Sequence, residues 1–250
     1  MSAAQLELLL RLGDNALVLA QRLSEWCGKG PVLEEDLATT NTALDLIGQA
    51  RLWFGYAGEL EGKGRDEDAL AYRRDAHQFR NVLLVEQPNG HYGDTIARQF
   101  YFDAFHLPLL RALSASSNAR IAEIAAKSAK EAAYHLERST DWVIRLGDGT
   151  EESHRRMQQS VDDLWMYTGE FFDADAVDRE MTAAGIAPDP AALREPWLAM
   201  VRKVFAEATL AVPGEAWMQR GGKQGVHTEQ LGFLLAEMQY LQRAYPDAKW

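Results

Sequence analysis

The chain has 250 residues, and its 26 basic and 37 acidic side chains give a formal charge of -11. A chain of this length can bury a full core without disulfides, and its negative field repels nucleic acid and anionic membranes. The single cysteine, Cys27, cannot form an internal disulfide, which is consistent with a reducing compartment. Arg11 and Asp14 interrupt the first apolar stretch too early for a signal peptide or a membrane span. We therefore expect a cytoplasmic protein with neither nucleic acid nor membrane as a partner.

The first 80 residues are predicted to form three helices. Apolar residues recur at steps of three and four up to Trp26, which is typical of a helix with one buried face. The same rhythm predicts helices over 33–60 and 67–80. On the second of these, the buried stripe is expected to consist of Leu37, Thr40, Leu44, Ile47 and Phe54.

The rest of the chain continues the helical pattern. Asp94 is a plausible cap for a fourth helix, which Pro108 should kink or end early. Further helices are expected over 119–146, after a Thr150 cap, and over 175–184, 193–210 and 228–245. Because no run alternates with the period of a strand, we predict a single all-α domain spanning 1–250, most simply a core bundle of long helices over about 1–172 with a helical extension over about 173–250.

An acid and a histidine three residues apart, Asp103 and His106, stand in the apolar stretch "FYFDAFHLPLL". A ferritin-like di-iron site takes one carboxylate from each of two helices and a Glu-x-x-His pair from each of the other two. The fifth helix offers Glu131 with His135 one turn on, but Tyr134 stands where the strict pattern needs histidine. Two of the four helices therefore offer only part of a ligand set.

The remaining ligands are missing from the sequence. The nearest counterpart on the second helix is Asp45-x-x-Gly48, and glycine has no side chain to bind a metal. We therefore predict no metal, no catalytic residue and a vestigial polar network made of Asp45, Asp103, His106, Glu131 and His135. The alternative is a free-standing di-iron oxygenase or oxidase that uses Asp103, His106, Glu131 and His135 with an atypical second half.

A basic patch precedes residue 81. It contains Arg73, Arg74, His77 and Arg80, and guanidinium groups suit phosphates, while Phe79 is a candidate to lie against an adenine. The other interpretation is a solvated helix end whose cations favour the helix dipole. Further along, 220–225 lacks the first glycine and the hydroxyl residue of a phosphate loop, so we expect a flexible link into a helix capped by Thr228.

Aromatic residues exceed what one buried stripe per helix requires. Those that look exposed in the pattern are Trp53, Phe54, Tyr56, Trp165 and Tyr167. Such extra apolar surface is expected where subunits pack, and a thick core explains part of it equally well.

Long stretches of the sequence resemble one family over nearly the whole chain, the PaaC-type subunit of the ring 1,2-phenylacetyl-CoA epoxidase, a multicomponent monooxygenase of phenylacetate degradation. The resemblance rests on "RLGDNALVLAQRLSEWCG", "ALDLIGQAR", "LLVEQPNGHYGDTIARQFYFDAFH", "FFDADAVD" and "GGKQGVHTEQLGFLLAEMQYLQRAYP". It implies a ferritin-like fold that has lost its metal centre. The implied role is structural rather than catalytic, within an NADPH- and O2-dependent complex.

The resemblance also implies partners and cofactors outside this chain. The di-iron centre belongs to a catalytic partner subunit, FAD, an iron-sulfur cluster and NADPH belong to a reductase, and the complex also has a small accessory subunit. Contacts with the CoA thioester, phenylacetyl-CoA, are implied for Gln78, Phe79, Arg80, Asn81, Arg179, Glu180 and Met181. A third interpretation is a CoA-binding helical module without an oxygenase partner.

Overall fold

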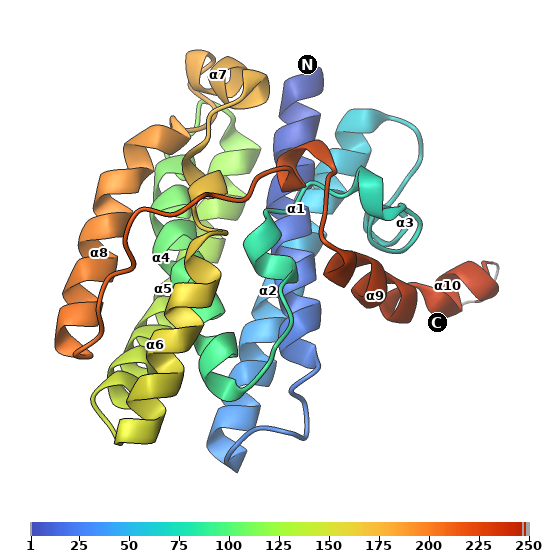
Figure 1. The fold of residues 1–250 in the computed structure, drawn as a ribbon. Coiled ribbons are helices and arrows are strands. Elements are labelled where there is room, and N and C mark those ends of the chain that lie inside the picture. Colours follow the sequence, from blue (N-terminus) through green and yellow to red (C-terminus); the bar gives the residue numbers. More distant parts are fainter. Residues whose placement is uncertain (1, 247, 249–250) are drawn as a thin grey trace. The chain divides into compact units, whose positions relative to one another are not determined.

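The computed structural model describes residues 2–246 and 248, and every regular element in them is a helix (Figure 1). The predicted all-α, ferritin-like class is confirmed. The α-helices are α1 (Ala3–Ser24), α2 (Leu33–Glu61), α3 (Glu67–Tyr72), α4 (Tyr92–Leu113), α5 (Ala119–Gly147), α6 (Glu151–Trp165), α7 (Ala176–Ala183), α8 (Arg194–Glu207), α9 (Glu229–Met238) and α10 (Tyr240–Ala244). Short 3-10 turns are η1 (Ala76–Gln78), η2 (Leu83–Glu86), η3 (Gly169–Phe172), η4 (Pro190–Leu193) and η5 (Gly222–Gln224).

The chain forms two compact units. The first combines Met1–Pro88 with Arg220–Trp250, and the second is Asn89–Gln219. The predicted division into a core bundle over 1–172 and an extension stays a prediction. In the described part of the chain, no helix has the length and apolarity that a bilayer span requires.

The first unit is built on an antiparallel hairpin of α1 and α2. Ser2 caps α1 by accepting a hydrogen bond from the Gln5 amide (3.3 Å). The Gln5 side chain then donates to the hydroxyl of Tyr56 near the far end of α2 (3.0 Å). Gly13 lies against the ring of Phe54, where a Cβ would clash, so the two helices approach closely at this point. In the same unit, α9 contacts α1, η1 and η2.

The buried face of α2 differs from the predicted one. Trp53, Phe54 and Leu46 are buried as core residues, whereas Leu37 and Leu44 are 55% and 59% exposed. The prediction of Leu37, Leu44 and Ile47 as a buried stripe was therefore wrong, although Phe54 is buried as that stripe requires. The reason is that α2 carries two apolar faces, and its spacing alone does not say which of them meets α1. Trp53, Phe54 and Trp165 looked exposed in the aromatic pattern, and that interpretation was wrong for these three, because all of them are buried.

The second unit is organised around α4, which is buried along most of its length. Its antiparallel partner is α5, because Tyr92 at the start of α4 packs against Trp142 near the end of α5, with ring centroids 5.3 Å apart. The helices α6 and α8 complete the packing, and the Tyr101 hydroxyl donates to the Val161 carbonyl (3.0 Å). Trp197 of α8 donates to the Tyr101 carbonyl (3.0 Å).

Helix ends agree with the sequence where the signal is local. Thr150 caps α6 as predicted, by accepting from the Ser153 amide (3.1 Å). The cap of α4 is His91, and Asp94 instead accepts from the His91 amide (2.8 Å). The helix also continues through Pro108 to Leu113, so the expected early end was wrong. The helices predicted over 67–80 and 228–245 are shorter, each divided into two elements.

Candidate functional site

The acid of the Asp103-x-x-His106 motif lies at the centre of the second unit. Asp103 is fully buried on α4, and its two carboxylate oxygens accept from the Gln99 side chain (2.7 Å) and the Ser139 hydroxyl of α5 (2.8 Å). Burial raises the pKa of Asp103 to about 6, against the opposing effects of His135, the two hydrogen bonds and Arg138. The carboxylate is therefore held chiefly by neutral donors.

His106 lies one turn further along the same helix. It is buried, its ring stacks at a tilt on Phe102 with centroids 4.8 Å apart, and its Nδ1 has no hydrogen-bond partner among the described residues. Burial and the nearby charge of His135 lower its pKa to about 3, so the ring is neutral at physiological pH. We call Gln99, Asp103, His106, His135 and Ser139 the Asp103 centre.

The other residues of the predicted network occupy different environments. On α5, His135 is 2% exposed, whereas Tyr134 is 50% exposed. The buried histidine therefore lies one residue after the position at which the di-iron pattern places it. Glu131 is half-buried on the same helix, and Asp45 lies on α2 in the first unit. The described residues include no group of three or more His, Cys, Asp or Glu side chains placed to hold a metal ion. The five-residue network as a whole stays a prediction.

The segment Gln78–Asn81 of the first unit is fixed by buried charges. Arg74 and Asp14 form an ion pair with side chains 2% and 0% exposed, and Asp14 also accepts from the Arg80 amide (2.8 Å). The Arg74 guanidinium lies 4.3 Å from the centre of the Phe79 ring, which is fully buried. Phe79 therefore has no free face for an adenine, and Arg74 serves the core instead of a phosphate.

A second buried acid holds the end of this segment, and the sequence did not single it out. Glu86 is fully buried and accepts from the Asn81 side chain (2.9 Å), His227 Nδ1 (2.8 Å), and the Thr228 amide (2.7 Å) and hydroxyl (2.8 Å). Thr228 thus stands at the start of α9, but its side chain serves Glu86 and makes no cap hydrogen bond to the helix. We call Asn81, Glu86, His227 and Thr228 the Glu86 centre.

The remaining predicted contact residues differ in exposure. Gln78 is exposed and Arg80 is partly exposed, with its guanidinium paired to Glu7 (2.8 Å). On α7 of the second unit, Arg179 and Glu180 are exposed, whereas Met181 is buried. Side-chain contact with a ligand is therefore open to four of the seven residues, while the side chains of Phe79, Asn81 and Met181 are buried.

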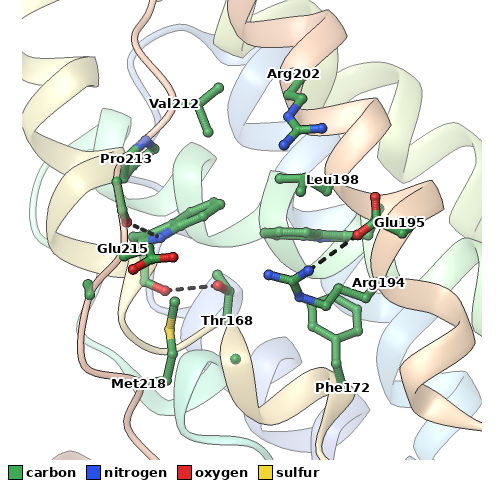
Figure 2. Close-up of a pocket in the computed structure, with 15 residues that line it drawn as sticks. Thr168, Phe172, Arg194, Glu195, Leu198, Arg202, Val212, Pro213, Glu215 and Met218 are labelled. Atoms are coloured by element: carbon green, nitrogen blue, oxygen red, sulfur yellow. Dashed lines mark hydrogen bonds and ion pairs between the residues drawn. The ribbon is translucent and has the colours of Figure 1, made fainter.

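A pocket of about 550 Å³ lies in the second unit between α8 and the segment 212–218 (Figure 2). Its lining includes Trp165 and Trp197, whose ring centroids are 5.5 Å apart. Figure 2 shows Arg194 and Arg202 on the α8 side and Glu215 on the opposite side, and Arg194 pairs with Glu195 (3.3 Å). Two cations and two acids share the lining, so the pocket does not favour one sign of charge.

Comparison with known proteins gives the class to which this fold belongs. A family model described as "Phenylacetic acid catabolic protein" matches residues 1–250, and the chain belongs to this family. A curated relative, one of the subunits of the 1,2-phenylacetyl-CoA epoxidase of Escherichia coli (strain K12), is 55% identical over 241 residues. The match covers 96% of this chain and 97% of the relative. The family inferred from the long sequence stretches is therefore confirmed.

Proposed function

We propose that the chain is a non-catalytic, structural subunit of a cytoplasmic 1,2-phenylacetyl-CoA epoxidase complex. It pairs with a related catalytic subunit that holds the di-iron centre, and a reductase with FAD and an iron-sulfur cluster delivers electrons from NADPH. A small accessory subunit belongs to the same complex. The proposal rests on the near-full-length similarity to an epoxidase subunit and on one structural observation.

That observation is the outward face of α2. Leu33, Leu37, Leu44 and Ile47 are 70%, 55%, 59% and 37% exposed and recur at helical spacing. Further along α2, an added Cβ at Gly48 or at Gly55 would meet nothing within 4 Å, so this surface is open there too. A continuous apolar stripe on a well-formed helix is typical of a protein interface, because isolated soluble proteins rarely expose one. It supports a permanent partner.

The Asp103 centre supports a structural role for the motif residues. Each carboxylate oxygen of Asp103 accepts from a neutral side chain, and the His106 ring packs against Phe102. A metal ligand set needs several anionic or imidazole donors that converge on one point. Here both Asp103 oxygens already accept hydrogen bonds within the protein, and Tyr134 lies outward where the pattern needs a ligand.

The proposal extends to contact with the CoA thioester. Gln78 and Arg80 in the first unit, and Arg179 and Glu180 in the second, have side chains that reach the surface. Arginine guanidinium groups form paired hydrogen bonds with phosphate oxygens. The backbone of the Gln78–Asn81 segment is also held by buried partners, so a ligand would meet a surface that is already ordered.

The first experiment separates a structural subunit from a free-standing oxygenase. The chain is purified alone and together with its related partner from iron-replete cells, and iron per chain and phenylacetyl-CoA turnover with reductase are measured. We expect iron and turnover only when the partner is present. Stoichiometric iron and turnover in the lone chain would favour the oxygenase alternative.

A second experiment tests the α2 surface. Leu44→Lys places a charge in the middle of the exposed stripe and should weaken pairing with the catalytic partner at least about tenfold, because a buried lysine at an interface lacks a partner. Leu241→Lys is the matched control, since Leu241 is 47% exposed on α10. Equal pairing of both variants would show that α2 is not the docking surface.

A further inference from the structure

The glycine-rich segment 221–225 packs directly against the backbone of 77–81. A Cβ on Gly222 would collide with the carbonyl oxygen of Asn81, and one on Gly225 with that of His77. Gly225 also has φ of +79°, a conformation that favours glycine. The segment expected to be a flexible link is therefore closely packed against the backbone of 77–81. This close approach requires glycine at positions 222 and 225.

His227 follows this segment and joins two parts of the first unit. Its Nδ1 lies 2.8 Å from the Glu86 carboxylate, and its Nε2 lies 3.0 Å from the carbonyl oxygen of Phe79. A carbonyl oxygen can only accept, and the Glu86 oxygens already accept from Asn81 and Thr228. With the Glu86 carboxylate ionised, both ring nitrogens act as donors, which is the doubly protonated imidazolium form.

The charges around the ring agree with this protonation state. Burial of the ring disfavours the charged form, but the hydrogen bond and charge of Glu86, the Phe79 carbonyl and the charge of Asp14 on α1 outweigh it, so the pKa of His227 is raised. Two nearby arginines donate to backbone carbonyls and not to the Glu86 carboxylate. Arg22 of α1 donates to the backbone carbonyl of Glu86 (2.8 Å), and Arg80 donates to the carbonyl that the ring meets (2.8 Å).

We propose that protonated His227 is a positioning residue that fixes the Gln78–Asn81 segment for CoA binding, and that loss of its proton at alkaline pH releases the segment. The inference rests on the proposed CoA contact. Deprotonation removes the donor toward either Phe79 or Glu86 and leaves that buried acceptor facing a lone pair. The segment 220–228 then loses its tie to the backbone that presents Gln78 and Arg80.

The pH window follows from the sign of the pKa change. Because the folded-state pKa lies above the ordinary value of 6.5, the stabilising contribution is fully present below that value. It is lost as the pH rises through the raised pKa. Tight binding is therefore expected at and below neutral pH, with a decline on the alkaline side.

The experiment uses the complex with its catalytic partner and measures two quantities from about pH 6 to about pH 9, a range that starts below the ordinary histidine pKa and extends well above it. One is the dissociation constant of phenylacetyl-CoA, and the other is amide hydrogen exchange in 77–81 and 220–228, corrected for intrinsic exchange. We expect affinity to fall about tenfold, and exchange in both segments to rise, across the same pH range. His227→Gln should show weak binding and fast exchange at every pH, and Glu86→Gln should move the midpoint to lower pH.

The control is His154→Gln, which changes a half-buried histidine whose Nδ1 contacts the Gly147 carbonyl (2.7 Å) in the second unit. It should keep the wild-type pH profile. If phenylacetyl-CoA binds but neither its affinity nor the exchange depends on pH or on His227, the positioning role is refuted while the proposed function stands. If the complex binds no phenylacetyl-CoA at any pH, the proposed CoA contact fails and the positioning role fails with it, whatever the exchange shows.

Discussion

The Glu86 centre of the first unit and the Asp103 centre of the second are built from the same kinds of residue, a buried carboxylate and buried imidazole. In the Glu86 centre, the histidine donates from both nitrogens and its pKa is raised. In the Asp103 centre, the pKa of Asp103 is raised to about 6 and that of His106 is lowered to about 3. One centre favours a charged pair, whereas in the other both pKa values are shifted toward the neutral forms.

The difference comes from the number of donors and acceptors that each fold supplies. Glu86 accepts from four donors, one of them an imidazolium, so two opposite charges support each other. Asp103 accepts from one amide and one hydroxyl, and His106 Nδ1 has no hydrogen-bond partner within the described residues. Burial is then the largest influence on the pKa of both groups, and it disfavours their charged forms.

The largest difference between the two centres is expected in the free energy of unfolding when each buried acid is replaced in turn. Glu86→Leu leaves the His227 imidazolium and the Asn81 amide buried without their acceptor, and we expect a loss of about 3–5 kcal/mol in the free energy of unfolding. Asp103→Leu should cost less, about 1–3 kcal/mol, because it strands only neutral donors. Ser139 also keeps the Leu136 carbonyl as an acceptor (3.3 Å). Urea denaturation at neutral pH measures both, and a larger loss for Asp103→Leu would contradict the charge assignment.

The pH dependence of Asp103 gives the next largest effect. Its folded-state pKa of about 6 exceeds the usual 3.8, so its stabilising contribution is present below about pH 3.8 and lost as the pH rises through about 6. The difference corresponds to about 3 kcal/mol. Asp103→Asn lacks this titration and should gain stability relative to the native chain between about pH 4 and about pH 8. Melting temperatures of the two proteins over this range check the sign, and parallel curves would refute it.

The sequence predicted the fold class and the long helices because those signals are local. The helix expected over 119–146 is found at Ala119–Gly147, and that over 33–60 at Leu33–Glu61. Apolar spacing and capping residues act within a few residues of the helix they define. The face of α2 that meets α1 is a tertiary property, so the stripe containing Leu37 and Leu44 was assigned to the wrong environment.

The candidate site was predicted less well, for the same reason. The Asp103–His106 spacing was visible because both residues lie on one helix, whereas Glu86 and His227 are 141 residues apart and only the fold joins them. The basic patch likewise gave no sign that Arg74 pairs with Asp14 in the core. A signal was present in "GGKQGVH", where three glycines closely precede a histidine. Their spacing, however, does not predict which backbone segment they contact.

His106 should respond to pH in the direction opposite to Asp103. Its folded-state pKa of about 3 lies below the usual 6.5, so its contribution to stability is present above about pH 6.5 and lost as the pH falls toward 3. His106→Leu removes a buried Nδ1 that has no hydrogen-bond partner in the described part of the chain, and at neutral pH it should change stability by less than about 1.5 kcal/mol. Acid denaturation followed by circular dichroism should become shallower than in the native chain. An unchanged acid limb would show that His106 does not titrate in this range.

The smallest effect is expected at Tyr134, the residue that stands where a metal-binding pattern needs histidine. Its side chain is 50% exposed, and its ring makes an edge contact with His135, with centroids 6.3 Å apart. Tyr134→Ala should therefore change the free energy of unfolding by less than about 0.5 kcal/mol. Tyr101→Ala on α4 is a matched control, because that ring is fully buried, and it should cost about 3–5 kcal/mol. If Tyr134→Ala approached the control, the tyrosine would belong to the interior of the unit, and the outward assignment of this helix face would be wrong.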